Sequence, residues 1–147
     1  MSSTNTTNAP STFEEILAQD GELFFTNEGG SMLPLIHAHL DVLHIVKPDK
    51  ELERSDVILY TDKPHHYVLH RILKIKKNGE IICAGDNNHW KDRPITRGMV
   101  LGRLLDVTYP NGKVIRLDSD YQKEGERCVR HFYWKAFKLR LKRLFRK

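Results

Sequence analysis

The fold of this chain is decided by two β-type runs joined by a tight turn, in the stretch from His66 to Ala84 that reads HYVLHRILKIKKNGEIICA. The pair Asn78-Gly79 favours a two-residue hairpin, because both residues tolerate positive φ. In the first run, the side chains at positions 68, 70 and 72 share one face, and those at 67, 69, 71 and 73 share the other. The stretch therefore predicts two antiparallel strands, at 66–76 and 80–84.

Further short strands are expected on both sides of this hairpin. Asn111-Gly112 is a second hairpin signal, and a capping box, either Ser11 with Glu14 or Thr12 with Glu15, predicts a short helix that Gly21 can end. So many short strands with so little helix favour a mainly β fold with a twisted antiparallel β-barrel-like core. The additional strands are predicted at 22–26, 42–46, 56–60, 99–109 and 113–118.

A serine, a histidine and an acid occur in the contexts that an activated nucleophile needs. Ser31 follows Gly29-Gly30, which permit a turn that leaves its hydroxyl and nearby amides exposed. His70 lies inside a predicted strand, and Asp86 lies on the next loop. The hydroxyl needs a base to take its proton, and the base needs an anion to hold its tautomer. Taken singly, His70 also fits a half-buried strand histidine, and Asp86 a structural turn residue.

Ordered blocks between residues 22 and 105 resemble the type I signal peptidase superfamily, which includes the LexA-like self-cleaving repressors. Histidine at the base position, followed by Asp92-Arg93 after the last block, resembles the Ser–His branch of archaea and the endoplasmic reticulum. The blocks are Gly30-Ser31-Met32-Leu33-Pro34, the strand that starts at Asp41-Val42, Asp56-Val57-Ile58-Leu59-Tyr60, Val68-Leu69-His70-Arg71-Ile72 and Gly85-Asp86-Asn87-Asn88.

The resemblance implies roles for four residues. Ser31 would be the nucleophile, and its backbone amide would help to hold the oxyanion. His70 would be the general base that later protonates the leaving amine. Asp92, with Asp86 as the second choice, would orient His70. The implied activity is that of a serine endopeptidase that cleaves a leader or signal-type peptide after a small residue, with no cofactor.

The chain departs from that family in two respects. The family usually has Gly-Asp where the strand after the serine loop begins, whereas this chain has Ala38-His39-Leu40-Asp41, so we expect the edge of the cleft to differ. Signal peptidases also carry a membrane-spanning segment, but the apolar runs here are far shorter than the roughly 18–20 residues that span a bilayer. We therefore expect a peptide or protein precursor to be processed on the cytoplasmic side, beside an exporter, rather than secretory cleavage.

The end of the chain is strongly basic. Residues 127–147 carry nine of the 24 Lys and Arg and no Asp or Glu. Apolar side chains recur there at steps of three and four, which predicts a basic amphipathic helix over 123–147. Contact with an anionic membrane or an exporter, packing on the β core, and nucleic-acid binding remain open as its role. In the membrane alternative, Phe132, Trp134 and Phe137 would enter the headgroup layer.

Composition sets the remaining expectations. The composition predicts a disordered tail at residues 1–10 and one peptidase core at residues 11–122. No signal peptide is recognised, so we expect a cytoplasmic protein that can also lie peripherally on the inner face of the membrane. Cys83 and Cys128 are too few for a disulfide framework, and the eight His lack the spacing of metal ligands, so no metal site is predicted.

Two other functions are alternatives to the peptidase. A LexA-like regulatory or DNA-associated protein would need a helix-turn-helix, for which the residues before Glu22 are too few, and would use Lys as its base, so nucleic acid is disfavoured as a partner. A non-catalytic peptide-binding module on the same fold would have no need of Ser31, His70 and both acids.

Overall fold

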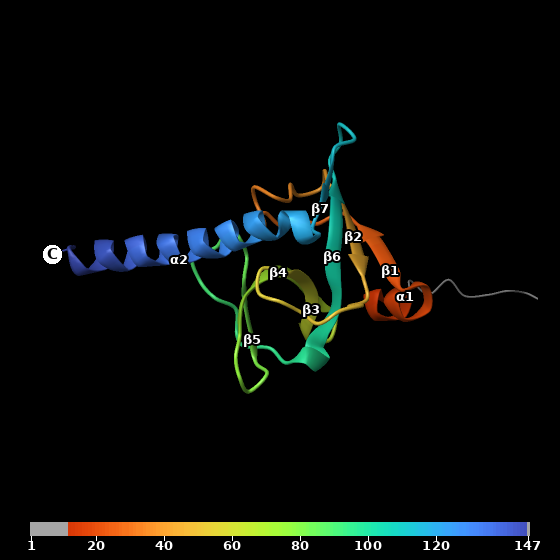
Figure 1. Cartoon of the computed structure of the whole chain (residues 1–147), viewed down its shortest axis with the longest axis horizontal. Helices are drawn as coiled ribbons and strands as arrows, with labels where there is room; N and C mark the ends of the chain where they lie inside the picture. The colour runs from red at the N-terminus through yellow and green to blue at the C-terminus, as the bar shows by residue number, and fades with distance from the viewer. Residues whose placement is uncertain (1–11, 147) are drawn as a thin grey trace, which may run out of the picture.

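The structure is a computed structural model that describes residues 12–146. The tail predicted at 1–10 and Ser11 lie outside the described residues. Figure 1 shows a β-sheet with a short helix at one side and a long helix that leaves the body. The elements are α1 (Phe13–Asp20), β1 (Glu22–Phe25), β2 (Val42–Val46), β3 (Val57–Lys63), β4 (His66–Ile75), β5 (Ile81–Ala84), η1 (Arg97–Met99), β6 (Val100–Thr108), β7 (Val114–Arg116), η2 (Ser119–Tyr121) and α2 (Gln122–Leu144).

The seven strands form one antiparallel sheet in the order β1-β2-β6-β3-β4-β5, with β7 paired to β6. The mainly β class is confirmed, but the sheet is not closed into a barrel, so the expected barrel-like closure is wrong. The two end strands, β1 and β5, have only four residues each, and no pairing joins them within residues 12–146. Closure requires a continuous ring of paired strands, and these short edge strands do not supply it.

The predicted turns form at the expected positions, but the two-residue type is wrong. Each loop has three residues: the Lys76 N–H donates to the Glu80 carbonyl at 2.8 Å and the Tyr109 N–H to the Lys113 carbonyl at 2.8 Å, and only the glycine of each Asn-Gly pair has positive φ. Gly79 and Gly112 adopt φ of 91° and 86°, which glycine reaches without steric cost. Thr12 caps α1 in a reciprocal capping box with Glu15, and Gly21 ends the helix in the left-handed conformation. These local codes therefore set the connections around the sheet.

Both faces of the sheet are covered at its centre. One hydrophobic cluster joins Leu17 of α1 to β2 and β6, and a second joins Ile58, Ile72 and Cys83. As a result, β4 is buried continuously from Leu69 to Leu73 instead of alternating between buried and exposed. Neighbouring residues of β4 therefore enter two different buried environments, and this separates His70 from Arg71.

The long helix α2 makes its apolar contacts with the sheet through its first half. Gly125, Val129 and Phe132 are its buried residues. A Cβ at Gly125 would lie 2.9 Å from the Ser55 hydroxyl oxygen, so glycine lets the helix approach the turn before β3. The second half of α2 extends away from the sheet (Figure 1). No helix within the described part of the chain is long and apolar enough to cross a membrane.

Candidate active site

Ser31 opens a turn that a second loop holds in place. The turn closes where the Leu33 N–H donates to the Gly30 carbonyl at 3.3 Å. From the loop after β5, the Asn87 N–H donates to the Ser31 carbonyl at 2.8 Å, and the Asn87 side-chain amide donates to the Gly30 carbonyl at 3.2 Å. The Ser31 N–H has no hydrogen-bond partner among residues 12–146. The serine backbone is thus fixed while one amide next to the hydroxyl remains free.

His70 lies between Ser31 and Asp92. Its Nε2 is 3.0 Å from the Ser31 Oγ, and its Nδ1 is 2.6 Å from the Asp92 Oδ2. An ionised carboxylate only accepts hydrogen bonds, so the proton of the neutral imidazole lies on Nδ1 and Nε2 is free to accept the serine proton. We call this arrangement the Ser31–His70–Asp92 relay. The His70 side chain is 11% exposed, so the relay is largely shielded from water.

Asp92 is oriented from two directions. Its backbone N–H donates to the Cys83 carbonyl at 2.9 Å, which attaches it to the end of β5. The Tyr60 hydroxyl donates at 2.7 Å to the same Oδ2 that contacts His70. Burial, together with this hydrogen bond, raises the pKa of Tyr60 well above its usual range, so the phenol remains a donor. Tyr60 was not singled out from the sequence, although it lies two residues from Ile58, the cross-strand partner of His70.

Gly85 allows the serine loop and the histidine to meet. A Cβ at this position would lie 2.7 Å from the Ser31 carbonyl oxygen and 3.0 Å from the His70 Nε2. Contacts that short between non-bonded heavy atoms force the chain to move. The glycine of the Gly85-Asp86-Asn87-Asn88 block is therefore required for close approach of two chain segments rather than for an unusual φ.

Asp86 lies away from His70 and pairs with Arg71, the next residue along β4. Its two carboxylate oxygens accept from the Arg71 Nε and Nη2, both at 2.8 Å. The Arg71 side chain is fully buried and that of Asp86 is 7% exposed. Burial alone would lower the pKa of Arg71, but the Asp86 carboxylate outweighs it and the net shift is upward. Of the two candidate acids, Asp92 alone contacts His70.

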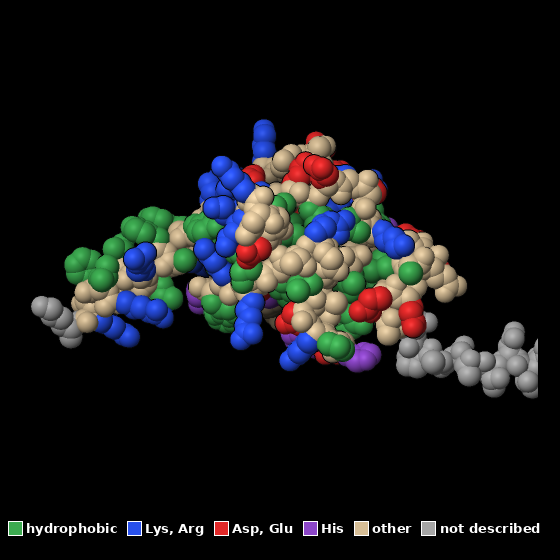
Figure 2. Space-filling model, turned by 90° about the horizontal axis from the view of Figure 1, so that it is seen from below, with side chains coloured by type: hydrophobic (Ala, Val, Ile, Leu, Met, Phe, Trp, Pro, Cys, Tyr) green, Lys and Arg blue, Asp and Glu red, His purple; other side chains and the backbone are tan. Residues whose placement is uncertain are grey.

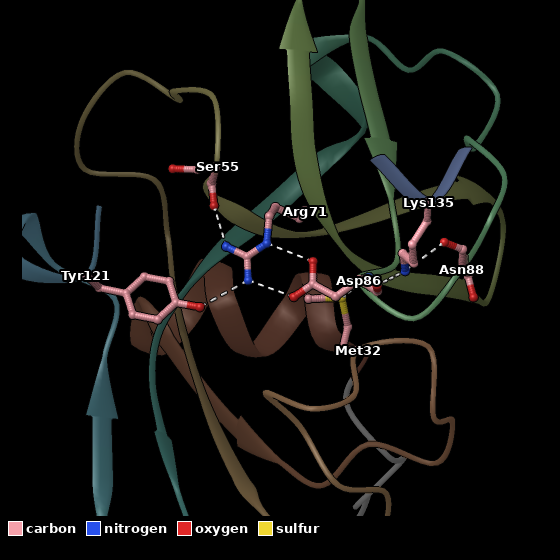
Figure 3. A network of polar contacts seen from close by, with 7 residues as sticks. All are labelled: Met32, Ser55, Arg71, Asp86, Asn88, Tyr121 and Lys135. Carbon is pink, nitrogen blue, oxygen red and sulfur yellow. Dashed lines mark hydrogen bonds and ion pairs between the residues drawn. The ribbon is translucent and has the colours of Figure 1, made fainter. Parts of the chain in front are cut away.

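The Arg71–Asp86 pair is the centre of a larger polar network, drawn in Figure 3. Arg71 also donates to the Ser55 carbonyl at 2.8 Å and to the Tyr121 hydroxyl at 3.1 Å. From α2, the Lys135 Nζ donates to the Asp86 carbonyl at 2.6 Å. The network therefore joins β4, the turn before β3, η2, the middle of α2 and the loop that holds Ser31. Arg71 and Lys135 were not predicted as part of the site.

An open groove of about 460 Å³ runs beside Ser31 and His70. One wall is residues 25–29, which lead from β1 to the serine turn, and the other is residues 67–70 of β4. This half of β4 pairs with β3 only, because β5 pairs with β4 from Arg71 onward. In a strand paired on one side, alternate backbone N–H and C=O groups stay available on the other side. The groove therefore offers an extended peptide a strand edge next to the serine hydroxyl.

Three other histidines, His37, His44 and His66, have acidic partners of their own, the last of them Asp62. His44 contacts Glu22 and Asp106, and His37 contacts Asp41. Within residues 12–146, no group of three or more His, Cys, Asp or Glu is placed to hold a metal ion. These histidines therefore lie in separate acid–histidine pairs of the fold.

Neither a scan against models of known protein families nor a search of curated proteins found a match to this chain. The chemistry of the groove and of the Ser31–His70–Asp92 relay is therefore the basis for a functional hypothesis.

Proposed function

We propose that this protein is a serine endopeptidase of the signal peptidase type, with Ser31 as nucleophile, His70 as general base and Asp92 as the residue that orients it. The observation that carries the proposal is the continuous contact from the Ser31 Oγ to the His70 Nε2 and from the His70 Nδ1 to Asp92, at 3.0 and 2.6 Å. A hydroxyl, a base and an anion in this order have the geometry of an activated serine.

The first half-reaction transfers the acyl part of the substrate to the enzyme. The His70 Nε2 takes the Ser31 hydroxyl proton as Oγ forms a bond to the scissile carbonyl carbon. The resulting oxyanion is placed to accept from the free Ser31 N–H. The C–N bond then breaks, the leaving amine takes the proton from His70, and an ester on Ser31 remains. Asp92 stabilises the imidazolium in between.

The second half-reaction returns the enzyme to its starting state. Water replaces the departed amine, His70 removes one proton from it, and the oxygen attacks the ester carbonyl carbon. The bond to Oγ breaks and Oγ recovers the proton from His70, which releases a carboxylic acid. Every proton passes through the His70 Nε2, so the neutral imidazole is needed at the start of each half-reaction.

The groove supports an extended peptide as the substrate. The free edge of β4 at residues 67–70 would pair with the backbone of the substrate, which gives affinity without dependence on sequence. Phe13, Phe25 and Tyr67 contribute aromatic surface to the groove, and their rings pack together with centroids 5.0 and 4.6 Å apart. A leader or signal-type segment of a precursor, cut after a small residue, is the substrate class that we propose.

A fluorophosphonate probe tests the nucleophile directly. We expect the folded wild type to gain the mass of one phosphonyl group on Ser31, with fluoride as the leaving group, and Ser31→Ala and His70→Ala to gain none. The matched control is Ser119→Ala, because Ser119 is an exposed serine at the start of η2 and does not line the groove. Labelling that persists in Ser31→Ala would refute the assignment. A wild type that binds peptides but is never labelled would instead favour a non-catalytic peptide-binding module.

A further inference from the structure

The two halves of α2 expose different faces. Successive residues of an α-helix are rotated by about 100°, so side chains can be placed around its axis from their numbers. The buried residues Gly125, Val129 and Phe132 lie on the side that meets the sheet. Four large apolar residues of the second half lie about 100–180° around the axis from Gly125, away from that side. We call this the distal apolar face; its members are Trp134, Phe137, Leu141 and Leu144, which are 53%, 51%, 37% and 69% exposed.

Cations border the distal apolar face, and the stretch of chain that carries it contains no acid. Residues 133–146 carry six Lys and Arg and no Asp or Glu. The Lys138 Nζ lies 5.1 Å from the centre of the Trp134 ring, so a cation and an aromatic side chain meet at the boundary of the face. In Figure 2, the projecting helix has apolar side chains along one side and Lys and Arg along the other. Apolar and cationic side chains are therefore exposed next to each other on a part of the helix that extends beyond the body of the protein.

We propose that residues 133–146, the second half of α2 and the two residues after it, bind peripherally to an anionic lipid surface. The distal apolar face would lie in the headgroup layer, and the flanking cations other than Lys135 would lie on the lipid phosphates. Basic amphipathic helices lie in membrane interfaces in this way, and aromatic side chains are favoured at that depth. This proposal is independent of the peptidase activity.

The positive charge of this segment, together with its apolar face, favours a lipid surface over a second copy of the helix or a nucleic acid as the partner. A second copy of the helix would bring Lys and Arg against Lys and Arg along the edges of the contact, which is unfavourable. A nucleic acid would use the cations but leave the apolar face in water. An anionic membrane satisfies the cations and the apolar face at the same time.

The structure also corrects the anchor expected from the sequence. Phe132 is 3% exposed and packs with Leu73, Ala84 and Val129, so it cannot enter a membrane. Lys135 is engaged with the carbonyls of Asp86 and Asn88. The lipid-binding segment therefore starts beyond the packed half of α2, and a chain that ends at Glu126 would lose core contacts as well as the anchor.

Vesicle flotation of the full-length protein tests the proposal. The vesicles contain either phosphatidylcholine alone or phosphatidylcholine with phosphatidylglycerol. We expect flotation with the anionic vesicles at low salt, at least tenfold less on phosphatidylcholine alone, and release as the salt concentration rises. The double variant Phe137→Glu/Leu141→Glu should lose at least tenfold in bound fraction and keep the melting temperature of the wild type, because both side chains project from the body.

The matched control is Val114→Glu, which puts a carboxylate on another exposed apolar residue, 49% exposed and on β7. It should float like the wild type. Equal flotation of the double variant and the wild type, or no flotation on anionic vesicles, would overturn the proposal. A wild-type dimer that the double variant makes monomeric, with no flotation, would assign the face to self-association. Fluorophosphonate labelling in the absence of vesicles should be unchanged in the double variant, which keeps this test separate from that of the peptidase.

Discussion

The roles of Asp86 and Asp92 can be distinguished by one pair of isosteric substitutions. Asp92→Asn and Asp86→Asn each replace a carboxylate by an amide of the same shape, and the two positions lie on one loop. Asp92 contacts His70 and Tyr60, whereas Asp86 contacts Arg71. We expect Asp92→Asn to lower catalysis with little loss of stability, and Asp86→Asn to lower stability.

The effect of Asp86→Asn follows from the burial of its partner. Arg71 is fully buried and remains charged, because its pKa is raised above the ordinary value. Loss of one partner from a buried ion pair costs about 3–5 kcal/mol, and the remaining amide oxygen places this case near the lower end. For a chain of this size we take about 3–4 °C in melting temperature for each kcal/mol, so a fall of roughly 10 °C is expected.

The effect of Asp92→Asn follows from the two groups that donate hydrogen bonds to Asp92, which are the His70 imidazole and the Tyr60 hydroxyl. The amide oxygen can still accept from His70 and from Tyr60, so the imidazole keeps its orientation but loses the negative charge that stabilises its protonated form. We expect the rate to fall by about 10² to 10⁴, with the upper end reached if the amide turns its NH₂ towards Nδ1. The Asp92 side chain is 15% exposed, and removal of its charge leaves no buried cation unpaired.

The assay pairs a thermal melt with the second-order rate of fluorophosphonate labelling for both variants. Labelling is measured well below the melting temperature of Asp86→Asn, so that unfolding is not counted as loss of activity. A variant Asp86→Asn that melts with the wild type, or an Asp92→Asn that labels at the wild-type rate, would refute the division of roles. A folded Asp86→Asn with the lower labelling rate of the two would require the roles to be exchanged.

Three further outcomes are expected. Tyr60→Phe removes a hydroxyl that donates at 2.7 Å to the orienting carboxylate, so the labelling rate should fall several-fold while the free energy of unfolding falls by only about 1 kcal/mol. Gly85→Ala puts a Cβ 2.7 Å from the Ser31 carbonyl and should slow labelling at least tenfold, whereas Gly98→Ala, with its nearest neighbour at 3.9 Å, should label normally. Cys83 is 1% exposed and burial raises its thiol pKa, so iodoacetamide should neither modify it in the folded protein, by mass spectrometry, nor slow fluorophosphonate labelling.

Features of the fold that depend on local chemistry could be predicted from the sequence. The positions of the strands follow from β-branched and aromatic runs, and the positions of the turns at Gly79 and Gly112 follow from the Asn-Gly code. Closure of the sheet could not be predicted in this way, because it depends on whether the first and last strands are long enough to meet. The sequence pattern indicates the length of each strand, but it does not show which strand is its neighbour in the sheet.

The residues of the candidate site likewise divide into those that local sequence predicts and those that it does not. Ser31 and His70 are marked by their immediate context, a glycine turn and a strand. The choice between Asp86 and Asp92 depends on the side of β4 that each approaches, which the spacing along one loop does not show. Tyr60 and Lys135 reach the site from other elements, so only the strand register and the docking of α2 reveal them. The pattern of α2 is helical throughout, and it does not show where packing on the sheet ends.

The adjacency of His70 and Arg71 makes the alignment of β4 with its neighbours a condition of both activity and stability. Side chains alternate between the two faces of a strand, so a slip of one residue in one direction would bring Arg71 to the position of His70 and Ile72 to the position of Arg71. The slipped chain would bury a permanent cation against Ser31, where it could take up no proton, and would leave Asp86 without its partner. The irregularities in pairing at 61–63 of β3 and at 72–74 of β4 enclose this segment and oppose such a slip. A misaligned chain would thus lose both the contact between Ser31 and His70 and the buried Arg71–Asp86 pair, so the error in alignment would also prevent stable folding.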